Sequence, residues 1–111
     1  MKDDKLYLIH IMESIDKVQS YTAGMSLASF IEASMVQDAV LRNLQVLAES
    51  TQRLSEDFKS KHQDVEWYKI AGLRNILVHD YLGLDLETVW AILEDKLPEL
   101  KEVISAALNK L

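Results

Sequence analysis

An arginine and a histidine lie close together in the stretch RNILVHDY, residues 74–81. Arg74 offers a planar fork of N–H donors that matches phosphate oxygens, and His79 can pass a proton near neutral pH. These groups suit cleavage of RNA, whose own 2′-hydroxyl supplies the nucleophile. His79 would remove that proton or protonate the leaving 5′-oxygen while Arg74 stabilises charge on the phosphoryl group. Such a reaction needs no metal and yields a 2′,3′-cyclic phosphate and a 5′-hydroxyl.

The spacing of this pair poses a geometric problem. Five positions correspond to about 140° of rotation in a regular helix, so a straight helix does not aim Arg74 and His79 at one point. The helix could loosen before Gly83, the Arg74 side chain could curl round, or a second chain could complete a groove. We favour a symmetric dimer, because a two-fold axis beside this helix would bring two arginines and two histidines to one cleft. The alternative is structural, with His79 as a capped or core histidine and Arg74 paired to a carboxylate.

A second stripe runs along the same predicted helix. It consists of Tyr68, Gly72, Asn75 and His79, and it is distinct from the core stripe of Trp67, Ile70, Leu73 and Leu77. A glycine inside a helix costs about 1 kcal/mol relative to alanine. Gly72 therefore indicates that a ligand, a neighbouring helix or a second subunit approaches closely. Tyr68 and Tyr81 are, by residue type, half-buried packing residues.

The elements that must position these residues are helices. Apolar residues recur every three or four positions nearly throughout, and the chain has three glycines and one proline. Leu8, Ile11, Ile15 and Val18 form the first stripe, which Gly24 ends. Ser26 caps a second, long helix reaching about residue 58, with a stripe from Val36 through Val40, Leu44, Leu47 and Thr51 to Leu54. The polar segment 59–64 follows as a connection.

The second half of the chain predicts two further helices. Asp64 caps the third helix, which ends at Gly83, and Asp85 caps a fourth whose stripe runs from Trp90 to Leu111. Pro98 removes the bond to the carbonyl of Glu94, which predicts a kink or two helices end to end. The prediction is an all-α fold, an antiparallel bundle of four to five helices formed by one domain of residues 1–111.

Composition limits the functional classes. The chain has no cysteine, which excludes disulfides, thiolate zinc sites and cysteine nucleophiles, and no metal or cofactor is expected because the three histidines lack ligand spacing. The net charge of -6 argues against a surface that coats nucleic acids, and no DNA is expected. No apolar run could span a bilayer and no signal peptide is evident, so a cytoplasmic location is expected. His10 and His62 have ordinary surface or packing roles.

The stretch WYKIAGLRNILVHDYLGLD resembles the signature of HepT-like proteins, a branch of the HEPN superfamily. That signature is an arginine, four residues, a histidine, one residue and a tyrosine, here Arg74, His79 and Tyr81. The resemblance extends to residues 39–59, which look like the family's second helix, and to residues 93–104, which look like its last. One departure is Ala48, where relatives often have glycine; only a packing change is expected.

The resemblance implies a homodimeric, HEPN-like helical bundle with the motif of both subunits lining a cleft. It implies a metal-independent endoribonuclease that serves as the toxin of a type VII-like HEPN/MNT toxin–antitoxin system, with RNA as substrate. Arg74 and His79 take the catalytic roles and Asn75 a supporting polar one. Tyr81 is the tyrosine to which the partner, a minimal nucleotidyltransferase antitoxin, attaches AMP from ATP. The added phosphate would repel RNA near His79.

Two alternatives stay open. The triplet LRN also occurs at residues 41–43, where Arg42 shares a polar face with Asp38 and Gln45. That face either lines the same cleft or forms solvated or intersubunit ion pairs. The alternative function is a non-catalytic helical module that binds a minimal nucleotidyltransferase and presents RNA or nucleotide to it. A purely structural dimer is a third possibility.

Overall fold

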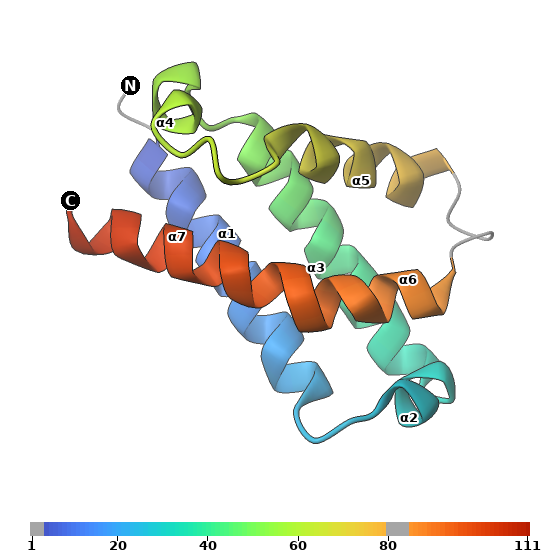
Figure 1. Ribbon diagram of the computed structural model, residues 1–111. Helices are drawn as coiled ribbons and strands as arrows, with labels where there is room; N and C mark the ends of the chain where they lie inside the picture. Colours follow the sequence, from blue (N-terminus) through green and yellow to red (C-terminus); the bar gives the residue numbers. More distant parts are fainter. Residues whose placement is uncertain (1–3, 80–84) are drawn as a thin grey trace.

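The computed structural model describes residues 4–79 and 85–111, and for residues 74–79 it describes the backbone alone. Most of these residues are helical, and the described ranges contain no strand, as the sequence predicts. The elements, drawn in Figure 1, are α1 (Asp4–Thr22), α2 (Leu27–Ile31), α3 (Ser34–Gln52), α4 (Glu56–Ser60), α5 (Trp67–His79), α6 (Leu86–Ala91), the π-helical turn η2 (Ile92–Lys96) and α7 (Leu97–Asn109).

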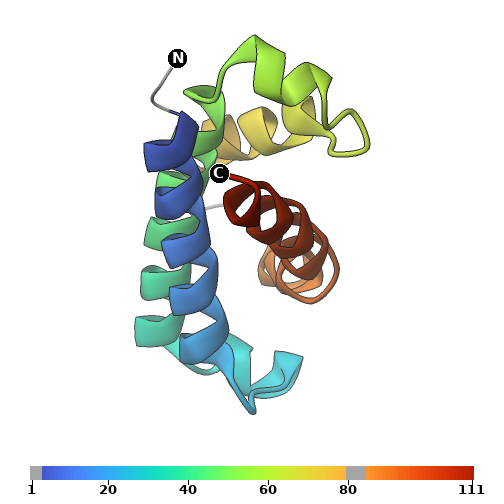
Figure 2. The ribbon, with the colours of Figure 1, turned by 90° about the vertical axis from the view of Figure 1, so that its left-hand side faces the viewer.

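Two pairs of antiparallel segments make up the fold. The long helices α1 and α3 pack along each other, while α5 and the continuous run α6–η2–α7 cross them (Figures 1 and 2). The predicted apolar stripes form the core between these pairs. Buried members are Leu8, Ile11, Ile15, Val18, Val40, Leu44, Leu47, Leu54, Trp90, Leu93, Leu97, Leu100, Ile104 and Ala107. The last predicted member, Leu111, is 69% exposed beyond the end of α7, so that part of the prediction is wrong.

The predicted long helix of residues 27–58 is wrong, because three helices take its place. Ser26 caps the first as expected, and it forms a reciprocal capping box with Ser29. After α2 the chain turns, and the Gln37 side chain of α3 donates 2.9 Å hydrogen bonds to the carbonyl oxygens of Phe30 and Ile31. These bonds satisfy acceptors that the end of α2 leaves open. A second break places Ser55 as the N-cap of α4.

Three other residues predicted to end, start or interrupt helices do so in the structure. Gly24 has a φ of 76°, a left-handed conformation that glycine adopts at little cost after a helix end. The Asp85 side chain caps α6 by accepting a hydrogen bond from the Glu87 backbone N–H at 3.0 Å. Near Pro98 the regular helix is interrupted by η2, where the Leu97 N–H donates to the carbonyl of Ile92. The proline thus divides two helices that run end to end.

None of the helices within the described ranges is both long and apolar enough to cross a membrane.

Candidate active site

The helix α5 carries the arginine–histidine motif and is anchored at its first residue. Its first turn begins directly after Glu66, whose carbonyl accepts from the Lys69 N–H at 2.9 Å. The predicted cap at Asp64 is therefore wrong by two positions. The Trp67 indole nitrogen donates to the carbonyl oxygen of His62 at 3.1 Å. This bond fixes the direction in which the helix leaves the preceding turn.

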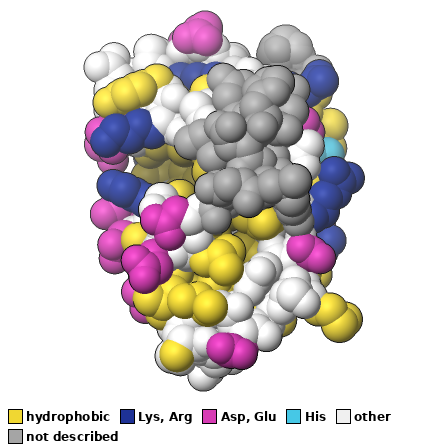
Figure 3. Space-filling model, turned by 90° about the vertical axis from the view of Figure 1, so that its right-hand side faces the viewer, with side chains coloured by type: hydrophobic (Ala, Val, Ile, Leu, Met, Phe, Trp, Pro, Cys, Tyr) yellow, Lys and Arg dark blue, Asp and Glu magenta, His cyan; other side chains and the backbone are white. Residues whose placement is uncertain are grey.

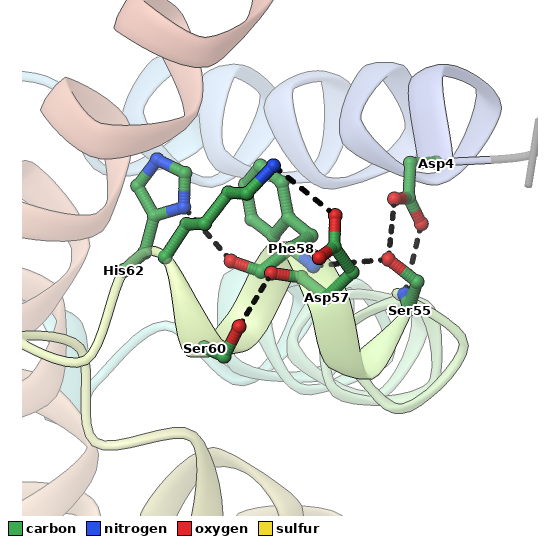
Figure 4. A network of polar contacts seen from close by, with 7 residues as sticks. Asp4, Ser55, Asp57, Phe58, Ser60 and His62 are labelled. Carbon is green, nitrogen blue, oxygen red and sulfur yellow. Dashed lines mark hydrogen bonds and ion pairs between the residues drawn. The ribbon is translucent and has the colours of Figure 1, made fainter.

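An aromatic cluster packs around Trp67 at the start of α5. The rings of Phe58 and His62 stack with centroids 4.3 Å apart, and Phe58 meets Trp67 edge-on at 6.0 Å. The His62 Nδ1 also lies 2.9 Å from the carbonyl oxygen of Phe58 (Figure 4). The packing role predicted for His62 is thus confirmed. His10 is half-buried and lies edge-on to Tyr7, with ring centroids 6.1 Å apart.

The motif residues follow one another along the second half of α5. Arg74, Asn75 and His79 belong to this helix, but their side chains lie outside the described residues, as does the whole of Tyr81. Their convergence on one point accordingly stays a prediction. The helical register does place positions 68, 72, 75 and 79 on one face, about 180° from the face of Ile70 and Leu73. Ile70 and Leu73 pack against the core, so the described part of the second face, Tyr68 and Gly72, points away from it.

The structure describes two residues of that outward face, Tyr68 and Gly72. Tyr68 is 72% exposed, which corrects the expectation of a half-buried packing residue. A Cβ atom added at Gly72 would meet no other atom within 4 Å. In the described part of the chain, no neighbouring helix therefore approaches Gly72. Of the explanations for this glycine, a neighbouring helix of the same subunit is removed, whereas a ligand or a second subunit is left.

A pocket of about 440 Å³ lies on a different side of α5. It opens between the first half of α5 and the η2–α7 segment, and Figure 3 shows a hollow with apolar side chains at its bottom. The apolar lining comes from Leu44, Leu47, Val65, Ile70, Leu73, Ile92, Leu97, Leu100 and Val103. Glu66 at the rim pairs with Lys69 at 3.2 Å and with Lys96 at 3.9 Å. Tyr68 and Gly72 do not line this pocket, so the described part of the motif face lies outside it.

The family model described as "Ribonuclease HepT-like" matches residues 11–107, a span that includes the motif, all of α3 and α5, and most of α1 and α7. The chain belongs to the HepT-like ribonuclease family. The resemblance stated from the stretch around Arg74 and His79 is thereby confirmed.

Individual relatives agree with this membership. A Methanocaldococcus jannaschii protein named "Putative RNase" is 34% identical over 93% of this chain and 94% of its own length. The "Probable ribonuclease HepT" of Thermococcus cleftensis is 30% identical over 90% of this chain and 91% of its own. Another M. jannaschii relative, "Gamma-glutamylcyclotransferase and putative RNase", is 34% identical over 99% of this chain, which spans only half of that protein. No solved structure matches.

In this HepT-like chain the neighbouring helix α3 carries the first LRN triplet. Arg42 and Asp38 are exposed, and Gln45 is half-buried. The Asn43 side chain donates to the Ala39 carbonyl at 2.9 Å within its own helix, so its amide is engaged locally. Within the described residues, no group of three or more His, Cys, Asp or Glu side chains is arranged to hold a metal ion.

Sequence reasoning missed the exposure of Tyr68 on the motif face. The signal was available, since position 68 lies opposite the core positions 70, 73 and 77 on a helical wheel. The pocket beside Lys69 and Lys96 was missed as well. It depends on where α5 lies relative to the η2–α7 segment, and no local pattern encodes that arrangement.

Proposed function

We propose that this HepT-like protein is a metal-independent endoribonuclease, the toxin of a type VII-like HEPN/MNT toxin–antitoxin system. The observation that carries the proposal is the family match over residues 11–107, which contains Arg74, His79 and Tyr81 in the family's motif spacing. Two relatives aligned over most of their own length have names that describe ribonucleases. An outward face on α5 that the described chain leaves open is a suitable place for a polymeric substrate.

The chemistry assigned to the motif is an internal transesterification. His79 takes the proton of the 2′-hydroxyl or donates a proton to the leaving 5′-oxygen. Arg74 donates hydrogen bonds to the phosphoryl oxygens as negative charge develops on them. Asn75, the next residue, supports the arginine. The P–O5′ bond breaks as the bond from O2′ to phosphorus forms, which leaves a 2′,3′-cyclic phosphate and a 5′-hydroxyl.

A homodimer completes the site in this proposal. Arg74 and His79 are about 140° apart on the helix, and the face that holds His79 points away from the core of its own subunit. A two-fold axis beside the end of α5 would turn two exposed faces into one cleft. The open space at Gly72 leaves room along this face for the second subunit or for the substrate.

The regulatory part of the proposal concerns Tyr81. A minimal nucleotidyltransferase antitoxin would transfer AMP from ATP to its hydroxyl, releasing pyrophosphate. The new phosphodiester adds negative charge and bulk two residues from His79, which disfavours binding of an RNA phosphate. Mass spectrometry after incubation with the partner and ATP should find AMP on the peptide that contains Tyr81. AMP on another peptide, or none at all, would contradict this assignment.

The nuclease assignment is tested with single-stranded RNA in excess chelator. Arg74→Ala and His79→Ala should each lower the cleavage rate by at least a hundredfold. The chain supplies matched controls, because Arg53→Ala removes an exposed arginine that follows α3 and His10→Ala removes a histidine on another helix. Both controls should cleave normally. If RNA is bound but never cleaved by any variant, the chain is the non-catalytic module instead.

A further inference from the structure

Tyr68 is an exposed aromatic side chain on the outward face of α5. Its neighbour Trp67 is fixed by a hydrogen bond to His62 and an edge contact with Phe58. Tyr68, by contrast, is 72% exposed and has no hydrogen-bond or ring partner among the described residues. Its ring therefore presents an apolar face and a polar hydroxyl on the surface, where a binding partner can contact both.

The position of Tyr68 relates it to the catalytic motif. Positions 68, 72, 75 and 79 lie within a narrow sector of α5, so Tyr68 and His79 mark the two ends of one stripe. Eleven residues of helix separate them by about 16 Å. Between them Gly72 contributes no side chain, and nothing in the described chain fills the space above it. A strand lying along α5 would meet no side-chain obstacle at position 72.

We infer that Tyr68 is a base-stacking residue that holds single-stranded RNA a few nucleotides from the bond that His79 and Arg74 cleave. This inference rests on the ribonuclease function proposed above. Aromatic side chains are platforms for unpaired bases, and stacking tolerates any base because every base has a π-face. Stacking also adds affinity without adding positive charge. This is important in a chain with a net charge of -6, because its basic side chains are outnumbered by acidic ones that repel phosphates.

The charged residues near Tyr68 in the sequence argue against the buried centre of a contact with a second copy of the chain. Asp64, Glu66 and Lys69 are all exposed and lie within four positions of Tyr68, and the buried centre of a protein interface is depleted in such charges. Among the described residues, Lys69 is paired only with Glu66, in an exposed ion pair at 3.2 Å. Such a pair is weak, so the lysine is free to turn toward a phosphate. In the proposed dimer, whose axis lies beside the other end of α5, Tyr68 occupies the outer end of the cleft.

Photo-crosslinking tests the inference without requiring cleavage. The probe is a single-stranded oligonucleotide with 2′-O-methyl groups throughout, which removes the nucleophile, and with one 5-iodouridine moved along its length. With the wild-type protein, we expect crosslinks on the peptide that contains Tyr68, strongest at one or two adjacent probe positions. Tyr68→Ala should lose that crosslink and bind the oligonucleotide about tenfold more weakly. Tyr68→Phe should keep the affinity, because the ring is retained.

The control is Tyr21→Ala, which removes another exposed tyrosine at the end of α1. It should leave both crosslinking and affinity unchanged. Unchanged affinity in Tyr68→Ala, crosslinks confined to other peptides, or absence of binding by the wild type would each overturn the inference. Dissociation of a dimer by Tyr68→Ala, measured by sedimentation, would overturn it too, since Tyr68 would then belong to a subunit contact. Cleavage of unmodified RNA that depends on His79 would survive all four results, so the two proposals fail separately.

Discussion

The carboxylate of Asp4 accepts two hydrogen bonds from Ser55, one from the hydroxyl at 2.7 Å and one from the backbone N–H at 2.8 Å (Figure 4). The same hydroxyl oxygen accepts from the Phe58 N–H at 3.0 Å and caps α4. The start of α1 is thus tied to the helix that carries Phe58. Phe58 in turn packs against Trp67 at the first residue of α5. The contact between Asp4 and Ser55 therefore links α1, through α4 and Phe58, to the first residue of the motif helix α5.

Asp4→Asn should lower the free energy of unfolding by about 1–2 kcal/mol, because it removes the charge from two charge-assisted hydrogen bonds in a partly buried site. Denaturant titration followed by circular dichroism measures the change. Asp57→Asn is the matched control, since Asp57 makes only an exposed ion pair with Lys61. Its effect should stay within about 0.5 kcal/mol. Equal effects of the two variants would show that the Asp4 contact does not anchor α4.

Two glycines should respond to alanine in opposite directions. Gly72 lies in α5 with open space around it, so Gly72→Ala should stabilise the chain by up to about 1 kcal/mol. Gly24→Ala should destabilise it by about 1 kcal/mol, because a φ of 76° strains any residue with a Cβ. Thermal unfolding at low protein concentration compares the two.

Gly72→Ala also tests the proposed dimer. If a second subunit packs closely on this glycine, the added methyl group should weaken self-association several-fold in sedimentation measurements. Unchanged self-association would place the subunit contact elsewhere and leave the ligand explanation for Gly72.

Phe30 should be the more important of two adjacent apolar residues in α2. Its side chain is fully buried, and its ring packs against Trp90 with centroids 5.1 Å apart, whereas Ile31 is 43% exposed. Phe30→Ala should cost about 3–5 kcal/mol and Ile31→Ala less than about 1 kcal/mol. Urea titration of both variants gives the comparison. A similar loss in each would contradict the docking of α2 on α6.

Local chemistry in the sequence predicted the helix boundaries that depend on single residues. Gly24, Ser26, Asp85 and Pro98 act where their own conformational or hydrogen-bonding properties indicate. The apolar spacing likewise predicted almost every buried residue of the core stripes. These features need no knowledge of distant contacts.

The boundaries that were missed depend on distant partners. The turn between α2 and α3 has no glycine or proline, and it is held by Gln37 reaching back to two carbonyl groups while Phe30 packs on Trp90. The break before α4 likewise depends on Asp4, which is 51 positions away from Ser55. The outward direction of Tyr68 was readable from the helical register, whereas its exposure depends on which elements lie nearby.

The most direct test of the account is the chemistry of the RNA ends. Wild-type protein in excess chelator should cut single-stranded RNA into products with 2′,3′-cyclic phosphate and 5′-hydroxyl ends, identified by mass spectrometry, and His79→Ala should yield none. Products with 3′-hydroxyl and 5′-phosphate ends, a requirement for added divalent metal, or undiminished cleavage by His79→Ala would contradict the proposed roles of His79 and Arg74.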